Sequence, residues 1–236
     1  RRRQISMRNE LPRILGSCLL ALAFSSQVCV AGEDLVQTAQ DKNGDVVPYI
    51  LNYRNLSPRY VLILFPGGTG IVNPRMENGK LIYSAKGNFL LRARAFIVDD
   101  EFVTVTTNST QLEERIQAII DDLKRRFPTA QIYLAGTSNG TFDTLQLAEY
   151  LSDKIAGEIH TSSLNRISAL DAKKYRNRHL VVHHRHDGCR VTNFGAAEAS
   201  HERHGTDFIA MDGGISVGDP CEAFAYHGYN GIEKET

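Results

Sequence analysis

The apolar positions of the chain fall into two patterns, short uninterrupted runs and stripes with helical spacing. Short apolar runs bounded by turn residues are typical of strands covered on both faces of a parallel sheet. Such runs predict strands over residues 46–51, 59–65, 95–98, 102–106, 131–135, 158–161, 179–183 and 207–211. Pro48 indicates that the first of these strands lies near a sheet edge, because proline cannot donate to a strand ladder.

Between these runs, apolar residues recur at the period of an amphipathic helix. Residues 112–127 carry one such stripe, which Thr110 and Glu113 introduce as a capping box and Pro128 ends. Two further helices are predicted over residues 141–151 and 193–204. Alternation of strands and helices predicts an α/β fold, with a mostly parallel central sheet and helices on both faces.

Composition adds limits to this picture. The chain has 236 residues, 42% of them hydrophobic, which is enough for one domain with a sizeable core. Its formal net charge is zero, so electrostatics give no reason to expect nucleic acid or an anionic membrane as a partner.

The N-terminus has the three parts of a secretory signal peptide. A basic stretch at 7–13 precedes an apolar run at 14–24, and small residues at 29 and 31 fit cleavage after Ala31. The apolar run is too short to span a bilayer, so no stable membrane anchor is expected after cleavage. We therefore expect a removed segment at 1–31, one domain at 32–236, and export to the periplasm or the exterior. The alternative, a lipoprotein signal ending at Cys18, fits less well because most of the apolar run follows that cysteine.

Residues 136–140 read Gly-Thr-Ser-Asn-Gly and match the nucleophile-elbow pattern Gly-x-Ser-x-Gly. An apolar strand precedes the pattern directly and a helical segment follows, which is the context that an elbow requires. Ser138 is therefore the candidate nucleophile. The alternative is a turn of small residues with an incidental serine.

A serine nucleophile needs a histidine base that is held by an acid, and in this context the chain order is serine, acid, histidine. Asp187 follows the strand at 179–183, and His227 follows the last predicted strand. The intervals between these residues are too short for a large lid domain. Alternative acids, which lie later in the chain than expected, are Asp207, Asp212 and Asp219.

Two cysteines, Cys189 and Cys221, remain after removal of the signal peptide. A disulfide is the expected state of such a pair in an oxidising compartment. It would join the loop of Asp187 to the loop of His227.

An oxyanion hole requires two backbone N–H donors. Asn139, directly after the nucleophile, supplies one, and Gly68 in the glycine-rich loop 66–70 is the first choice for the other, with Gly67 or Thr69 as alternatives. A phosphate-binding role for this loop is disfavoured, since the loop lacks the Gly-Lys-Ser/Thr ending of a P-loop.

The histidines at 183, 184 and 186 raise the question of a metal site. His183 and His184 are neighbours on a strand and point to opposite faces, and no third ligand has an obvious place. We expect them to be hydrogen-bonded neighbours of the acid loop. Neither a metal nor an organic cofactor is predicted.

These motifs together resemble the α/β-hydrolase superfamily, and more narrowly the small exported bacterial serine hydrolases with a Gly-Thr-Ser-x-Gly-Thr elbow. The similarity extends from Tyr60 to Glu233 and includes the elbow at 136–141, the acid loop at 183–192 and the segments 218–223 and 227–233. It implies a lidless α/β-hydrolase fold and the triad Ser138, Asp187 and His227. Asn139 departs from the pattern, because relatives often carry a basic residue there.

The sequence therefore predicts an exported serine hydrolase that acts on small carboxylic esters without a cofactor. The alternative function is a non-enzymatic binding protein that retains the fold. Such proteins usually lack one member of the triad, whereas this chain has a candidate for each member.

Overall fold

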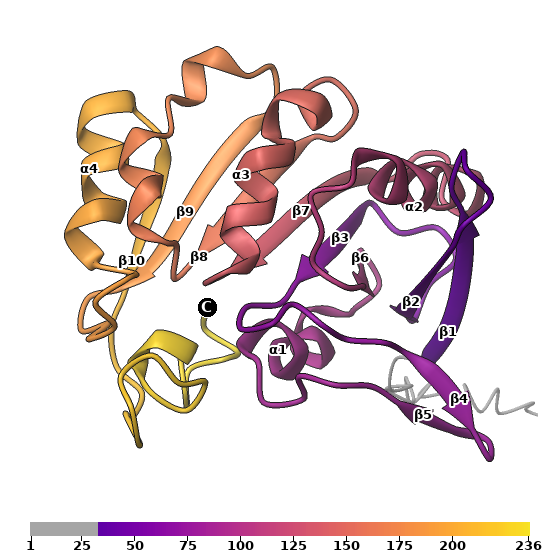
Figure 1. The fold of residues 1–236 in the computed structure, drawn as a ribbon, viewed down its shortest axis with the longest axis horizontal. Helices are drawn as coiled ribbons and strands as arrows, with labels where there is room; N and C mark the ends of the chain where they lie inside the picture. The colour runs from indigo at the N-terminus through magenta and orange to yellow at the C-terminus, as the bar shows by residue number, and fades with distance from the viewer. Residues whose placement is uncertain (1–32) are drawn as a thin grey trace, which may run out of the picture. The chain divides into compact units, whose positions relative to one another are not determined.

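The computed structural model describes residues 33–236, so the predicted signal peptide and its cleavage site lie outside the described residues. Within this part, eight strands form one sheet in the order β1-β2-β6-β3-β7-β8-β9-β10 (Figure 1). The strands are β1 (Glu33–Gln40), β2 (Val46–Tyr53), β3 (Tyr60–Phe65), β6 (Phe102–Thr106), β7 (Gln131–Thr137), β8 (Gly157–Thr161), β9 (Arg178–His184) and β10 (Asp207–Met211). β1 and β2 pair antiparallel and β2 pairs antiparallel with β6, while all the remaining pairs of this sheet are parallel.

Four α-helices, a small hairpin and three 3-10 turns complete the described fold. The helices are α1 (Phe89–Ile97), α2 (Glu113–Arg126), α3 (Gly140–Leu151) and α4 (Phe194–His204). The hairpin consists of β4 (Arg75–Glu77) and β5 (Lys80–Ile82), and the 3-10 turns are η1 (Asn165–Ala169), η2 (Ala172–Lys174) and η3 (Tyr226–Gly228). None of the described helices has both the length and the apolar character that crossing a membrane requires.

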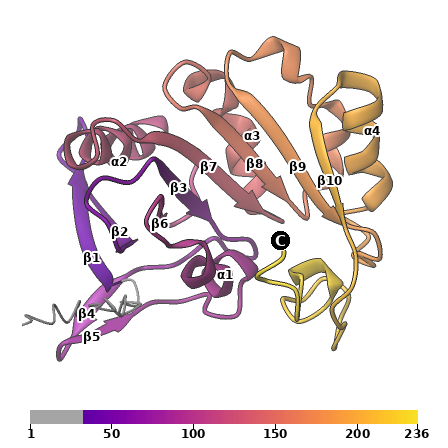
Figure 2. The same ribbon diagram turned by 180° about the vertical axis from the view of Figure 1, so that it is seen from behind.

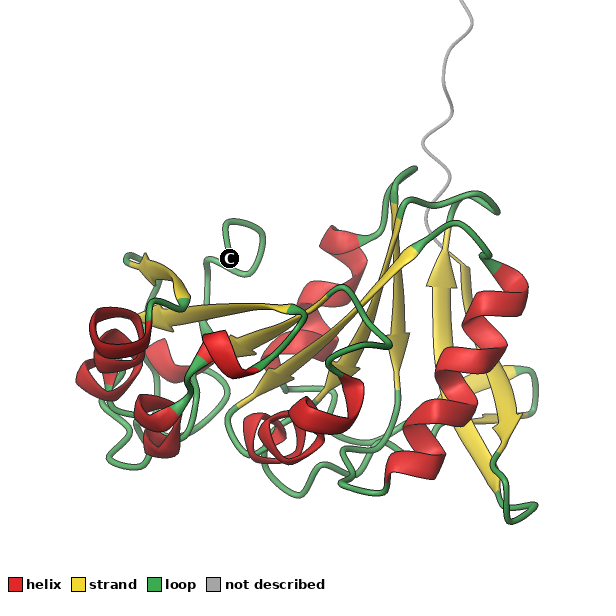
Figure 3. Cartoon of the chain, turned by 90° about the horizontal axis from the view of Figure 1, so that it is seen from above, coloured by secondary structure: helices red, strands yellow, loops and turns green. Residues whose placement is uncertain are grey.

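Helices cover both faces of the sheet, as the unbroken apolar run of β3 predicts. Successive strand residues point to opposite faces. Ile63 packs in the cluster that contains α2 and the C-terminal half of α3, whereas Leu64 packs in the cluster that contains α1. Figure 2 shows the strands β8 and β9 in front of α3, and Figure 3 shows helices on either side of the strand layer.

The parallel strands bring their C-terminal ends to one edge, where α/β sheets commonly place functional groups. The loop after β3 carries Gly68, the loop after β7 carries Ser138, and the loop after β9 carries Asp187. The segment after β10 then places His227 in η3.

The prediction of a strand at 95–98 is wrong, because most of this run forms the end of α1. Phe89, Leu90 and Ala93 have helical spacing and pack against the sheet, whereas Phe96 is 59% exposed. The side chain of Asn88 caps the helix by accepting a hydrogen bond from the Leu90 N–H at 3.1 Å. Local hydrophobicity alone did not distinguish this short helix from a strand.

Strand β2 lies near a sheet edge, as Pro48 suggested, because only one strand lies outside it. Strand β1 lies outside β2, with Thr38 opposite Pro48, so β1 is the edge strand. The polar residues Asp34, Gln37 and Thr38 interrupt the apolar pattern of β1, as is common at a sheet edge.

The helix start predicted for residues 110–113 is wrong by a few residues. Helix α2 begins at Glu113, and its N-cap residue, Leu112, makes no side-chain capping bond and is 53% exposed. The Thr110 hydroxyl instead accepts a hydrogen bond from the Leu112 N–H at 3.1 Å. Such a local turn competes with a capping box for the same side chain.

Candidate active site

Ser138 lies at the sharp turn between β7 and α3, with a φ of 52°. A non-glycine residue in this left-handed region is strained by about 1 kcal/mol or more and marks a position that the surrounding structure over-determines. The glycines on either side make the turn possible. A Cβ on Gly136 would lie 2.8 Å from the Gly140 carbonyl oxygen, and a Cβ on Gly140 would collide with the Phe65 carbonyl oxygen.

Asp187 lies in the loop after β9, with its side chain inaccessible to solvent. Its Oδ2 atom lies 2.9 Å from Nδ1 of His227 and accepts a hydrogen bond from the Thr192 hydroxyl at 3.0 Å. Its Oδ1 atom accepts from the Cys189 N–H at 2.9 Å, and His183 Nε2 lies 3.3 Å from Oδ2. The carboxyl group is thus surrounded by donors.

Opposing effects act on the pKa of Asp187. Burial alone would raise it, but the hydrogen bonds from His183 and His227 and the backbone donor at Cys189 outweigh burial and hold the pKa well below its usual range. Asp187 is therefore ionised at neutral pH and accepts from Nδ1 of His227, which leaves Nε2 of that imidazole for other partners.

The backbone around His227 is held by the ends of β8 and β9. The hydroxyl of Ser162 donates to the His227 carbonyl oxygen at 2.6 Å. The hydroxyl of the fully buried Tyr229 accepts from the Ser162 N–H at 3.0 Å and donates to the Val182 carbonyl oxygen at 2.8 Å. The position of the imidazole is thereby fixed from two strands.

Arg92 on α1 anchors the same loop from the other side. Its guanidinium donates to the carbonyl oxygens of Gly228 at 2.8 Å and Ala223 at 3.1 Å, and it pairs with Glu233 at 2.8 Å. The Arg92 side chain is only 16% exposed, so these charge-assisted bonds lie in a partly dehydrated setting.

A disulfide joins Cys189 to Cys221, as predicted, with the Cα atoms 4.6 Å apart. Cys189 is two residues from Asp187 and also supplies the N–H that binds its Oδ1 atom. The bridge therefore connects the acid loop directly to the segment that precedes His227.

The loop after β3 passes close to Ser138. A Cβ added at Gly67 would lie 2.8 Å from the Cβ atom of Ser138, and Gly68 has a φ of 63°. The Asn139 side-chain amide donates to the Gly68 carbonyl oxygen at 2.9 Å. This bond ties the two segments that carry the N–H groups predicted for an oxyanion hole.

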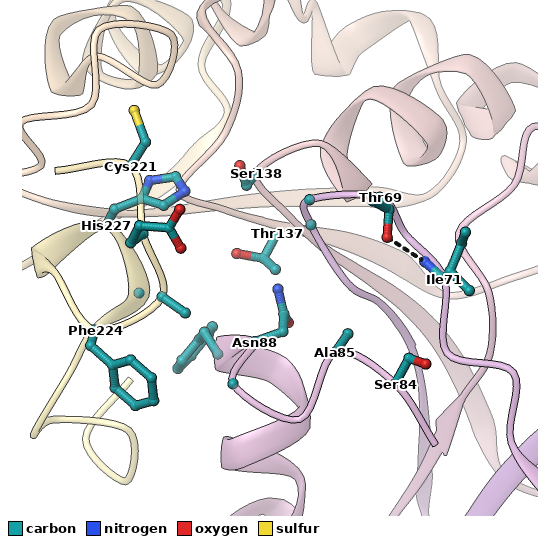
Figure 4. A pocket seen from close by; sticks show the side chains of 17 residues that line it. Thr69, Ile71, Ser84, Ala85, Asn88, Thr137, Ser138, Cys221, Phe224 and His227 are labelled. Atoms are coloured by element: carbon teal, nitrogen blue, oxygen red, sulfur yellow. Dashed lines mark hydrogen bonds between the residues drawn. The ribbon is translucent and has the colours of Figure 1, made fainter. Parts of the chain in front are cut away.

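Ser138 and His227 line the same cleft of about 640 Å³ (Figure 4). Phe224 and Ile71 lie on its walls and are about half-exposed, and most of the remaining lining is made of glycine, alanine, serine and threonine residues. Glu222 and His227 are its only ionisable lining residues among residues 33–236. The described lining therefore contains no lysine or arginine that could bind an anionic group.

The alternative acids contact other groups. Asp207 pairs with Arg178 at 2.8 Å, Asp212 is exposed and lies 3.5 Å from His186, and Asp219 accepts from the Cys221 N–H at 2.9 Å. In the described part of the chain, Asp187 is the carboxylate that contacts His227.

The histidines of the acid loop do not converge on a common point. Nε2 of His183 lies 2.8 Å from the Thr192 carbonyl oxygen, and Nε2 of His184 lies 2.9 Å from the Gly213 carbonyl oxygen. Both donate to backbone, as expected for hydrogen-bonded neighbours of Asp187.

Several residues that organise the site were not predicted from the sequence. Thr192 lies 3.1 Å from Nδ1 of His227 while it donates to Asp187, and Arg92, Ser162 and Tyr229 hold the histidine loop. Thr192 and Tyr229 lie within the segments 183–192 and 227–233 that carry the family resemblance, but no role was assigned to them, and Arg92 and Ser162 belong to no motif.

Comparisons with known proteins agree in fold while sequence similarity is low. No protein-family model matches the sequence, and no curated protein matches it. Est1E from Butyrivibrio proteoclasticus is similar in structure with a TM-score of 0.58 and 15% identity, covering 85% of this chain and 96% of that one. The esterase domain of a Rhodothermus marinus protein gives a TM-score of 0.56 and 12% identity over 86% of this chain and 95% of that one.

A third similar structure is an α/β serine hydrolase without a lid from Xanthomonas campestris. It has a TM-score of 0.55 and 13% identity, and the match covers 86% of this chain and 93% of that one. At these identities the likeness concerns the fold. The described chain has the α/β-hydrolase fold in its lidless form, as predicted.

Proposed function

We propose that this protein is an exported serine hydrolase that cleaves carboxylic esters, with Ser138 as nucleophile, His227 as base and Asp187 as acid. The observation that carries the proposal is the 2.9 Å contact between Asp187 Oδ2 and His227 Nδ1, together with the cleft that His227 and Ser138 both line. The strained backbone of Ser138 and the esterase domain among the similar structures support the same conclusion.

In the first half of the reaction, the Ser138 hydroxyl attacks the ester carbonyl carbon and its proton passes to Nε2 of His227. The negative charge on the carbonyl oxygen is stabilised by the N–H groups of Asn139 and Gly68. When the tetrahedral intermediate collapses, the C–O bond to the alcohol breaks and the alcohol takes the proton from the imidazolium.

In the second half, water attacks the acyl-enzyme and gives its proton to His227. The carboxylic acid leaves and the proton returns to Ser138. Asp187 stays ionised throughout, because hydrogen bonds keep its pKa low, and it stabilises the imidazolium in both halves.

The lining of the cleft favours a small ester without net charge. Its small side chains offer no cation for a carboxylate or phosphate of the substrate. The exposed Phe224 and Ile71 provide limited apolar surface, which suits a short acyl chain better than a long one.

The signal-peptide pattern and the disulfide both support an exported protein, periplasmic or secreted. Small-molecule esters are the proposed substrates. Cleavage after Ala31 would release the domain from the membrane.

Hydrolysis of 4-nitrophenyl esters from acetate to decanoate tests the proposal. We expect turnover with the short esters and a loss of kcat of about a thousandfold or more in Ser138→Ala and His227→Gln. Ser152→Ala, at the other end of α3, is the matched control and should keep full activity. A folded wild type that hydrolyses no ester would favour a binding protein instead.

A further inference from the structure

A second cluster of chemically reactive side chains lies on the face of the sheet that α3 covers. Glu158 and His160 belong to β8 and His179 belongs to β9, and none of the three is more than 2% exposed. Residues two apart on a strand share a face, and Glu158 lies opposite His179 in the strand register. One carboxylate and two imidazoles therefore converge in the protein interior.

The spacing of the ligand atoms fits a metal ion. One donor atom from each residue lies within 4.8 Å of the other two. Nε2 of His160 lies 3.1 Å from Nδ1 of His179 and 3.9 Å from Oε2 of Glu158. Tetrahedral zinc with bonds of about 2.0–2.1 Å places its ligand atoms roughly 3.3 Å apart, so small side-chain movements suffice.

Thr144 orients the imidazole ring of His160 for metal binding. The Thr144 hydroxyl lies 3.2 Å from the Thr141 carbonyl oxygen, to which it donates, and its oxygen lies 3.2 Å from Nδ1 of His160. The Thr144 oxygen then accepts from Nδ1–H, which leaves the lone pair of Nε2 directed toward His179. Metal-binding histidines commonly have such a second hydrogen bond.

Buried atoms without partners provide an independent indication. The Asn177 side chain lies beside that of Glu158, but no hydrogen bond of ordinary geometry joins them, and neither carboxylate oxygen of Glu158 has another such partner. A buried carboxyl group without a well-formed hydrogen bond is costly in free energy, and a cation would give it a partner. Asn177 is 9% exposed and its side chain lies beside that of Glu158, so its amide oxygen is the candidate for a fourth ligand.

We propose that Glu158, His160 and His179 bind one divalent transition-metal ion, with zinc as the ion that their nitrogen and oxygen donors suit best. The site is closed by α3 and by Tyr175, whose ring centroid lies 4.8 Å from that of His179. Closed sites of this kind are structural. The ion would link β8 to β9. Ser162 directly follows β8, and the loop of Asp187 follows β9.

Metal content of the purified full chain is the first test. After exposure to excess Zn²⁺ and desalting, we expect one zinc per wild-type chain by elemental analysis. Glu158→Gln and His179→Gln should lose it, and His204→Gln, at the end of α4, should keep it. Zinc retained in full by both site variants would overturn the proposal.

A second test needs no variant and is independent of hydrolysis. Co²⁺ added to the metal-free wild type should give the visible absorption of a tetrahedral nitrogen and oxygen site. EDTA should lower the Tm by about 5 °C and Zn²⁺ should restore it, because an ion that binds only the folded state stabilises it. Absence of the cobalt band together with a Tm insensitive to EDTA and zinc would show a metal-free polar cluster.

Discussion

The side-chain amide of Asn139 donates a hydrogen bond of 2.9 Å to the backbone carbonyl oxygen of Gly68. The two residues lie on separate loops, after β7 and after β3, and each carries one of the N–H groups proposed for the oxyanion hole. The bond therefore sets the spacing of two donors that must be in place before negative charge develops.

Asn139→Ala should lower kcat about three- to tenfold with little change in KM, because one hydrogen bond that positions Gly68 is lost. Steady-state hydrolysis of a short ester measures both constants. Gln111→Ala is the control, since it removes an exposed amide that donates to Asp143 at 3.0 Å. A rise in KM with kcat unchanged would mean that Asn139 contacts the substrate in its ground state instead.

Asp187→Asn should change how stability depends on pH. The pKa of Asp187 in the folded state lies below its ordinary value of 3.8, so the unfolded chain binds more protons in acid. The contribution of the ionised Asp187 carboxylate to the free energy of unfolding is fully present above the ordinary pKa. It is lost as the pH falls through the pKa that Asp187 has in the folded state. The unfolding free energy of the wild type should exceed that of the variant by about 2 kcal/mol at pH 7, and by less at pH 3.

Urea unfolding of both proteins from pH 3 to pH 8 provides this comparison. Two curves that run parallel over the whole range would contradict the hydrogen-bonded, ionised state of Asp187.

Two glycines near Ser138 should respond differently to alanine. A Cβ at Gly140 would collide with the backbone of Phe65, whereas a Cβ at Gly68 meets nothing within 4 Å and is opposed only by the φ of 63°. We expect Gly140→Ala to lower the unfolding free energy by about 3 kcal/mol, and Gly68→Ala by about 1 kcal/mol. Denaturant unfolding measures both values. Equal losses would show that the elbow can move away from β3.

Removal of the disulfide should affect stability and activity separately. The bridge closes a loop with a sequence separation of 32, for which chain entropy gives about 3–4 kcal/mol. Replacing Cys189 and Cys221 together by serine should therefore lower the Tm. It should also lower kcat at temperatures where the variant is fully folded, since the bridge connects the loops of Asp187 and His227. A folded variant with unchanged kcat would limit the bridge to stability.

The parts of the fold that were predicted correctly are those with strong local signals. A few residues of sequence were enough to predict the apolar strand β3. The same is true of the strand, turn and helix around Ser138. Strand β1 was missed because its polar residues suit an edge, and helix α1 was mistaken for a strand because the run at 95–98 is short. Both errors arose because the structure of each segment depends on its packing partners, and the local sequence pattern carries no information about those partners.

In the candidate site too, residues with a local sequence signal were predicted, whereas residues that only the fold brings together were not. Ser138, Asp187 and His227 were proposed from a motif and from chain order, while Thr192 and Arg92 reach the loop of His227 only through folding. Among the histidines, adjacency drew attention to His183 and His184, which donate to backbone. His160 and His179 are 19 residues apart, and only the register of β8 against β9 brings them together.

Labelling by a fluorophosphonate probe tests the central claim most directly, because such probes react with a serine that a neighbouring base activates. The purified wild type should gain the mass of one adduct, and peptide mapping should locate it at Ser138. Ser138→Ala and His227→Gln should not be labelled, while Ser152→Ala should label like the wild type. A folded wild type that does not react, or an adduct on another serine, would contradict the proposed triad.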